Sequence, residues 1–351
     1  MCAFEDEGLK KAFSRYSLVV EGRAKAKYIV AKGIAVKKPK NLKNAWEEHR
    51  GALEKMRTAL ESNTPIRPAT FSLLDLKHHI AKQLIQACCL CERKCGVDRR
   101  ENRGFCGVGE EARISSAFVH TGEEPELVPS GTIFFNGCTF RCAFCQNWDI
   151  SQFPEGGEEW TQEEIGGWID RMKGQIINVN LVGGEPTPNL HNILGSLRYC
   201  NANLPIVWNS NMYMSAQSMK LLEGIVDLFL ADFKYGNDEC ALRFSEVPDY
   251  FNAVSRNHLL ASEHAELLIR HLIMPNHLEC CTKPILNWIR RNLNDKARVN
   301  LMSQYRPVHK AREHEDIARR ITVDEYEEAV LYSKKIGLRN VEIQGPPFPF
   351  G

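Results

Sequence analysis

From Gly131 onward the chain alternates short apolar, β-branched segments with helical segments, and this pattern constrains the fold more than any other feature. The predicted strands span residues 132–135, 176–182, 205–209, 226–233, 266–273, 297–302 and 340–343. The predicted helices span residues 162–173, 190–200, 215–223, 249–261, 282–293 and 323–336. Two of these helices begin at capping boxes, Thr161 with Glu164 and Thr322 with Glu325. This alternation predicts parallel βα units, in which ligands gather at the carboxyl ends of the strands.

The first predicted strand runs directly into three cysteines, Cys138, Cys142 and Cys145, with the spacing C-x3-C-x2-C. A loop at the end of a strand can curl its thiolates around one centre, and three soft ligands favour zinc or an iron–sulfur cluster. A [4Fe-4S] cluster normally has four cysteine ligands, so three would leave one iron open to a ligand from outside the protein. A zinc knuckle or three buried thiols are the structural alternatives.

The ends of the other predicted strands carry polar side chains suited to a bound ligand. Gly183-Gly184-Glu185-Pro186 follows the second strand, where the glycines let the backbone approach a ligand and Glu185 can accept hydrogen bonds from an ammonium group. Further candidates at strand ends are Asn209, Asn211, Asp232, Lys234, Arg270 and His271. For Asp232 and Lys234, a salt bridge between the two weighs equally with ligand binding.

A second group of cysteines lies upstream, at Cys88, Cys91, Cys95 and Cys106, with Cys89 as an extra thiol. Four thiolates with the spacing C-x2-C-x3-C-x10-C are enough to close a tetrahedral site, which would be structural or electron-relaying. Zinc and a second iron–sulfur cluster both remain open, and a knot of reduced thiols is the alternative without metal. We interpret the other five cysteines as core or incidental thiols: Cys2, Cys200, Cys240, Cys280 and Cys281.

Composition limits the class of protein. The first residues, up to Phe13, are polar and acidic, unlike a signal peptide, so we expect a cytoplasmic protein. In a reducing cytoplasm, the thirteen cysteines indicate metal or redox chemistry and not disulfide bonds. No apolar run reaches the ~18 residues of a membrane span. Residues 1–60 carry fourteen Lys or Arg against seven Asp or Glu, yet the whole chain has a net charge of only +1. A solvated helical extension is therefore favoured over a nucleic-acid-binding or partner-binding segment.

The expected domains are a basic helical extension (1–70), a helix with a cysteine-rich metal-binding segment (71–125) and a core barrel (126–351).

Several motifs together resemble the branch of the radical SAM superfamily that is related to the pyruvate formate-lyase activating enzyme. The matching segments are the Cys88-to-Cys106 group, GEEP at 122–125, GTIFF at 131–135, CAFCQN at 142–147, GGEP at 183–186, NSNMY at 209–213, DFKY at 232–235 and QYRP at 304–307. The resemblance covers about residues 86–345 and implies an α/β fold, a partial (β/α)6 TIM-like barrel. It also implies that Cys138, Cys142 and Cys145 hold a [4Fe-4S] cluster whose open iron binds S-adenosyl-L-methionine (SAM).

The expected function is an enzyme, an oxidoreductase that reductively cleaves SAM to a 5′-deoxyadenosyl radical and takes hydrogen from a protein or peptide. We expect Gly183, Gly184 and Glu185 to contact the methionine amino group, Asn209 and Asn211 the ribose, and Arg270 or His271 the carboxylate or ribose. A one-electron reductant such as ferredoxin or flavodoxin is the expected partner, with neither membrane nor nucleic acid. Modification of a small molecule or RNA is one alternative, and a non-catalytic iron–sulfur carrier or scaffold is another.

Overall fold

The computed structural model describes residues 12–62, 66–343 and 345, and Cys2 lies outside them. The chain divides into two compact units. Unit 1 comprises Met1–Thr139, Asp149–Asn209 and Met214–Leu228, and unit 2 comprises Phe140–Trp148, Ser210–Tyr213 and Phe229–Gly351. The boundaries leave β5 in unit 1 except for Ser210, and β6 in unit 2 except for Leu228. The expected boundaries at residues 70 and 125 do not coincide with this division.

Unit 1 contains five strands in the order β3-β1-β2-β4-β5. Their bounds are β1 Ala112–His120, β2 Ser130–Phe135, β3 Glu158–Trp160, β4 Asn178–Gly183 and β5 Ile206–Ser210. The pairs β2·β4 and β4·β5 are parallel, as predicted, whereas β1 runs antiparallel to both β2 and β3. The antiparallel strands β1 and β3 were not predicted. Strand β1 precedes the βα alternation, and β3 interrupts it between β2 and α7 (Gln162–Met172). Phe118 and Val119 of β1 are also partly exposed, which blurs its apolar pattern.

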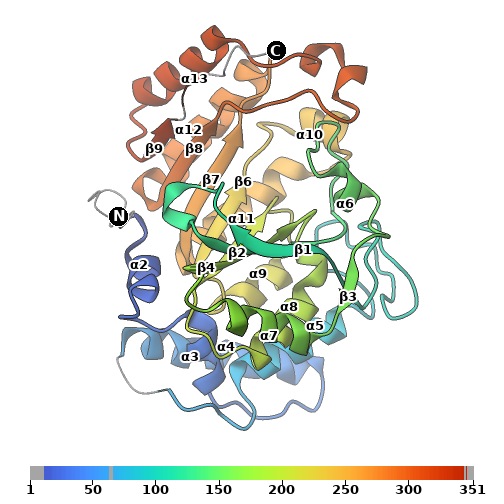
Figure 1. Cartoon of the computed structure of the whole chain (residues 1–351), viewed down its shortest axis with the longest axis vertical. Helices are drawn as coiled ribbons and strands as arrows, with labels where there is room; N and C mark the ends of the chain where they lie inside the picture. Colours follow the sequence, from blue (N-terminus) through green and yellow to red (C-terminus); the bar gives the residue numbers. More distant parts are fainter. Residues whose placement is uncertain (1–11, 63–65, 344, 346–351) are drawn as a thin grey trace. The chain divides into compact units, whose positions relative to one another are not determined.

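The helices of unit 1 are α2 Ser14–Val20, α3 Lys27–Gly33, α4 Leu42–Glu61, α5 Leu73–Leu84, α7 Gln162–Met172, α8 Leu190–Tyr199 and α9 Ala216–Leu222 (Figure 1). The short α6 Trp148–Gln152 has its first residue in unit 2 and the others in unit 1. Helices α7, α8 and α9 lie where the sequence predicted them, whereas α2, α3 and α6 were not predicted individually. The capping box of Thr161 and Glu164 begins α7 as expected.

The first three helices are not the solvated extension that their charge predicted. Phe13, Tyr16 and Tyr28 are fully buried. Asn178 of β4 donates a hydrogen bond of 2.8 Å to the Tyr16 hydroxyl, and the backbone N–H of Lys27 donates one of 3.1 Å to Asp227. The Lys27 ammonium donates to the Val226 carbonyl oxygen at 2.9 Å. Helices α2 and α3 thus bury aromatic side chains in unit 1, and Lys27 is buried with them, so net charge alone did not predict this burial.

Lys77 of α5 is fully buried, with its Nζ 2.8 Å from His49 Nε2 and 3.1 Å from the Lys220 carbonyl oxygen. Burial lowers the pKa of Lys77 from 10.5 to about 7. Between those pH values the unfolded chain binds the proton that the folded chain has lost, so stability should rise with pH. We expect Lys77→Met to remove this rise, as measured by urea unfolding at pH values across that interval. Lys82→Met, at a half-exposed lysine of the same helix, should keep it, and equal pH slopes for wild type and Lys77→Met would contradict the prediction.

Unit 2 contains the strands β6 Leu228–Asp232, β7 Glu266–Leu272, β8 Ala297–Met302 and β9 Val341–Ile343, in that order. The pairs β7·β8 and β8·β9 are parallel. Its helices are α10 Asp238–Ser245, α11 Tyr250–His264, α12 Lys283–Asn292 and α13 Val323–Lys335, and a π-helical turn spans Leu278–Thr282. The box of Thr322 and Glu325 begins α13 as predicted.

Among the described strands, the hydrogen-bonded order ends at β3 and at β9 and does not close on itself. The predicted α/β class with parallel strands is confirmed. Helix α10 was not predicted, although Asn237 caps it by accepting a hydrogen bond of 2.8 Å from the Cys240 N–H. Among the described residues, no helix combines the length and the apolarity that crossing a membrane requires.

Candidate functional site

In unit 1, the predicted Gly-Gly-Glu-Pro turn lies against the end of β2, just before Cys138. Gly183 has a φ of +126°, and a Cβ at this position would overlap the backbone of Phe135. A Cβ at Gly184 would overlap the carbonyl of Gly137, and the Gly184 N–H donates to the Phe135 carbonyl oxygen at 2.9 Å. The two glycines therefore allow two backbone segments to pack closely, a role that the sequence interpretation, which invoked only a ligand, had missed.

Glu185 follows these glycines and is 1% exposed. Its Oε1 accepts hydrogen bonds from the Thr187 N–H at 3.2 Å and from the Thr187 hydroxyl at 2.5 Å. These bonds fix the carboxylate in one orientation at the carboxyl end of β4. A buried, oriented carboxylate of this kind can receive an ammonium group.

In unit 2, Cys142 lies at the end of a hydrogen-bonded chain. The Ser245 hydroxyl donates to Cys142 Sγ at 2.9 Å, and Ser245 Oγ is 2.5 Å from the Tyr235 hydroxyl. The backbone N–H groups of Arg141 and Ala143 also donate to the carbonyl oxygens of Ser245 and Phe244, at 3.0 and 2.7 Å. Ser245 and Tyr235 were not singled out from the sequence, since Ser245 lies at the end of the unpredicted α10.

The Lys234 ammonium interacts electrostatically with the Cys142 sulfur. Burial raises the pKa of Cys142 to about 12, while Lys234 and the Ser245 hydroxyl oppose this effect. Burial alone would lower the pKa of Lys234, but Asp232 and Cys142 outweigh it and hold the pKa above its ordinary value. The Lys234 ammonium forms the salt bridge with Asp232 that was one of the two expectations for this pair, at 2.5 Å. Lys234 is thus a permanent positive charge close to the Cys142 sulfur.

The remaining strand-end candidates differ in their surroundings. Asn209 and Asn211 are 8% and 6% exposed, and Asn211 Oδ1 accepts a hydrogen bond of 3.0 Å from the Tyr213 N–H. Both ring nitrogens of His271 are engaged, with the Phe233 carbonyl oxygen at 2.8 Å and the Thr282 hydroxyl at 2.9 Å. Burial lowers the pKa of His271 to about 4, so it is neutral. Of the predicted pair, Arg270 is therefore better suited than His271 to meet a carboxylate.

The upstream cysteines of unit 1 line one cavity: Cys88, Cys91, Cys95 and Cys106. Two of the thiols flank Gly104, where a Cβ would lie 3.2 Å from Cys95 Sγ and 3.6 Å from Cys106 Sγ. The Arg99 guanidinium donates to Cys106 Sγ at 3.2 Å and to the Pro188 carbonyl oxygen at 2.8 Å. Arg93 donates to the Thr139 carbonyl oxygen at 2.7 Å. The cysteine segment is thus tied to the residues that follow Cys138 and Glu185.

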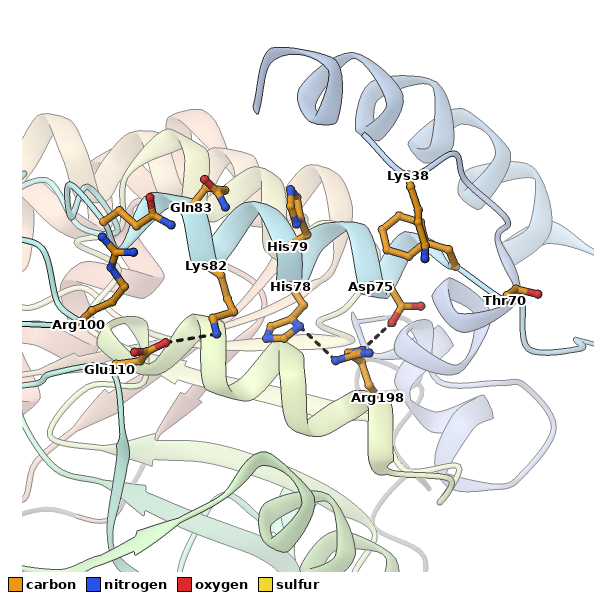
Figure 2. Close-up of a pocket in the computed structure, with 12 residues that line it drawn as sticks. Lys38, Thr70, Asp75, His78, His79, Lys82, Gln83, Arg100, Glu110 and Arg198 are labelled. Atoms are coloured by element: carbon orange, nitrogen blue, oxygen red, sulfur yellow. Dashed lines mark hydrogen bonds and ion pairs between the residues drawn. The ribbon is translucent and has the colours of Figure 1, made fainter. Parts of the chain in front are cut away.

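A larger polar cavity of about 630 Å³ lies beside α5 and α8 of unit 1 (Figure 2). Its basic side chains are mostly paired: Lys82 lies 3.3 Å from Glu110, and Arg198 lies 2.6 Å from Asp75 (Figure 2). Because carboxylates offset this charge, the cavity does not favour a polyanion such as RNA.

Comparison with known proteins identifies the class of the chain. The model of the radical SAM superfamily matches residues 132–289. A relative from Methanocaldococcus jannaschii, uncharacterized protein MJ0674, is 46% identical over 332 residues, which cover 92% of this chain and 97% of the relative. The chain therefore contains a radical SAM superfamily domain.

Other matches are more distant. Uncharacterized protein MJ0808 of the same organism is 34% identical over 97 residues, which span 22% of this chain and 29% of that protein. Streptococcus suis SuiB bound to its precursor peptide SuiA has a TM-score of 0.47 at 12% identity, over 86% of this chain and 61% of SuiB. SuiB bound to SAM matches with a TM-score of 0.44 at 13% identity, over 59% of this chain and about half, 48%, of SuiB. Methylornithine synthase (PylB) matches with a TM-score of 0.43 at 15% identity, over 93% and 77%.

Radical SAM proteins are enzymes that use a [4Fe-4S] cluster and SAM, and these are the cofactors of this chain. The surroundings of Cys142 fit a sulfur ligand of such a cluster. A cysteine sulfur bound to iron is anionic, and a hydroxyl donor and a lysine ammonium both stabilise negative charge on it.

Ser245→Ala should lower the reduction potential of the cluster, because hydrogen bonds to cluster sulfurs stabilise the reduced form. A bond of ~0.5–1.5 kcal/mol corresponds to about 20–60 mV for one electron. The measurement is a redox titration of the reconstituted protein, followed by electron paramagnetic resonance. Ser255→Ala, at a half-buried serine whose hydroxyl donates to the Asn252 carbonyl oxygen of its own helix, is the matched control. A Ser245→Ala potential equal to that of the control would contradict the role of Ser245.

Proposed function

We propose that this chain reductively cleaves SAM at a [4Fe-4S] cluster held by Cys138, Cys142 and Cys145, and that its substrate is a protein or peptide. The observation that carries the assignment is the environment of Cys142, whose sulfur accepts a hydrogen bond from Ser245 and interacts electrostatically with Lys234. A hydroxyl donor and a cation both stabilise the anionic form of the sulfur, which is the form that binds iron. When bound, the cluster supplies the electron that breaks the C5′–S bond of SAM.

The chain's own residues would hold and orient the cofactor. In this proposal Gly183, Gly184 and Glu185 contact the methionine amino group, Asn209 and Asn211 contact the ribose, and Arg270 contacts the carboxylate. The Lys234 ammonium would stabilise the negative charge of the sulfur ligands, and its ion pair with Asp232 would hold the ammonium in place. The apolar and aromatic residues around these groups exclude water, which strengthens each of the polar contacts.

Glu185→Ala tests the amino-group contact. Losing one charge-assisted hydrogen bond costs about 1.5–3 kcal/mol, which predicts a roughly 10- to 150-fold weaker affinity for SAM. The measurement is an anaerobic binding isotherm on the reconstituted protein. Glu163→Ala, at an exposed carboxylate in the first turn of α7, should bind as wild type does. A Glu185→Ala isotherm that matches the wild type would remove Glu185 from the site.

A protein or peptide substrate is proposed on the resemblance to the activating-enzyme branch, together with ferredoxin or flavodoxin as the reductant. Modification of a small molecule or RNA is the second candidate. The basic side chains of the polar cavity beside α5 and α8 are paired with carboxylates, which does not favour RNA. A non-catalytic carrier would not need Glu185 at the end of β4.

The upstream cysteines, Cys88, Cys91, Cys95 and Cys106, are proposed as a separate closed metal site. Their position around one cavity supports this proposal. Arg93 and Arg99 bond to the carbonyl oxygens of Thr139 and Pro188, so the segment would also support the loops that follow β2 and β4. Metal and sulfide analysis of a variant without Cys138, Cys142 and Cys145 would distinguish zinc from a second cluster. A metal-free result would leave these residues as structural thiols.

The test of the function is anaerobic incubation with SAM and a reductant, assayed for 5′-deoxyadenosine. We expect slow formation alone and faster formation with a glycyl radical protein from the same cell, with a radical signal on that partner. Acceleration by RNA or by a metabolite instead would overturn the proposed substrate. No product from protein with a full cluster and bound SAM, in the presence of these partners, would favour the carrier.

A further inference from the structure

We propose that Cys240, His277 and Cys280 of unit 2 form a binding site for a soft divalent metal ion, with zinc as the natural probe. The sequence interpretation treated the two cysteines as core or incidental thiols, because they lie outside the two cysteine groups. The fold brings one ligand atom of each residue within 4.8 Å of the other two. This site is independent of the proposed SAM chemistry and shares no residue with it.

The distance between the sulfurs matches metal coordination. Two thiolates about 2.3 Å from a tetrahedral zinc ion lie roughly 3.8 Å apart. Cys240 Sγ and Cys280 Sγ are 3.9 Å apart. A disulfide would require about 2 Å. The fourth position is open to Cys281 Sγ, which is 4.0 Å from Cys280 Sγ, or to a water molecule.

His277 is held in the tautomer that a metal needs. Its Nδ1 lies 2.7 Å from the Pro275 carbonyl oxygen, which can only accept, so Nδ1 carries the proton. In the neutral ring, Nε2, the nitrogen on the other side, then has a lone pair for a ligand. A backbone carbonyl that orients the distal nitrogen is the usual arrangement behind a metal-binding histidine. His277 is also 5% exposed, so its ring is fixed by packing.

Local backbone structure holds the ligands together. Asn237 accepts from the Cys240 N–H at 2.8 Å and donates to the Cys280 carbonyl oxygen at 2.8 Å, so one side chain joins both cysteine segments. Cys280 lies in the π-helical turn Leu278–Thr282, and such turns occur frequently at functional sites. A Cβ at Gly236 would lie 2.6 Å from the Cys280 carbonyl oxygen, so this close approach requires glycine.

The nearby charges are balanced. Asp316 Oδ2 lies 3.5 Å from His277 Nε2, and Arg243 holds the Asp316 carboxylate through hydrogen bonds of 2.7 and 2.9 Å. The Asp316 charge is therefore offset, and the two thiolates would supply the charge that neutralises a divalent cation. Two sulfurs and one imidazole select zinc over magnesium or calcium.

The first experiment uses the wild-type full chain under reducing, anaerobic conditions. Thiol alkylation is followed residue by residue by peptide mass spectrometry, with and without zinc. We expect zinc to protect Cys240 and Cys280 together, and a chelator to remove the protection. Alkylation of Cys280 at the same rate with saturating zinc would overturn the site, and so would a Cys240–Cys280 disulfide in protein that takes up no zinc there.

The second experiment counts metal. Cys240→Ser/Cys280→Ser should bind one zinc ion per chain fewer than wild type, whatever the other cysteine groups hold. The control is Cys200→Ser, at a buried thiol outside every proposed site, and its zinc content should equal that of wild type. If the double variant folds, by circular dichroism, and keeps the wild-type zinc content, the proposal fails. If it does not fold, the alkylation experiment on the wild type decides.

Discussion

Cys142→Ala should reduce 5′-deoxyadenosine formation to the level seen without protein and should remove the iron of one cluster. Two remaining cysteines cannot supply the three ligands that the motif provides, and the donor Ser245 would lose its acceptor. The measurement is iron and sulfide content after anaerobic reconstitution, followed by the SAM cleavage assay.

Cys200→Ala is the matched control for this prediction. Its thiol is fully buried but lies outside both cysteine motifs, so its loss should leave cleavage unchanged. A variant without Cys138, Cys142 and Cys145 that still cleaved SAM would refute the assignment of these residues. This outcome is separate from loss of stability, which circular dichroism of the same preparations would detect.

Gly183→Ala should lower the free energy of unfolding by about 3 kcal/mol or more, one of the largest effects of any single methyl group in this chain. The backbone at φ +126° is strained for any residue with a Cβ, and the added carbon would also overlap the Phe135 backbone. Neither backbone segment can yield easily, because both belong to the ladder that joins β2 and β4. Urea unfolding of the full chain measures the loss.

Gly174→Ala separates the two causes. Gly174 has a φ of +90°, but nothing lies within 4 Å of the position of its Cβ. It should therefore cost only the conformational part, ~1–2 kcal/mol. If Gly183→Ala and Gly174→Ala were equally costly, the close packing of the two backbone segments would have no energetic importance.

The sequence predicted well where local pattern and structure coincide. The strand that ends before Cys138 and the helices that begin at Thr161 and Thr322 lie where their apolar period and caps indicated. The same holds for Glu185, whose position at the end of β4 follows from the preceding strand. Each of these features depends on fewer than about twenty consecutive residues, which is the range over which periodicity is informative.

Features that depend on distant residues were not predicted. Ser245 reaches Cys142 only because α10 lies against the cysteine loop, and no pattern in either segment indicates that contact. His271 looked like a ligand at a strand end, but its two nitrogens are engaged by Phe233 and Thr282. The Asn237 side chain brings Cys240 and Cys280 together through hydrogen bonds to their backbone groups, which spacing alone cannot reveal.

The burial of the first helices has a consequence for synthesis of the chain on the ribosome. Tyr16 finds its partner 162 residues later, and Lys27 finds Asp227 after 200 residues. At about 5–20 residues per second, these helices would wait roughly 10–40 s for the strands and loops that cover their aromatic side. During that interval Tyr16 and Tyr28 would be exposed on the nascent chain, which makes α2 and α3 a natural site for a ribosome-associated chaperone to bind.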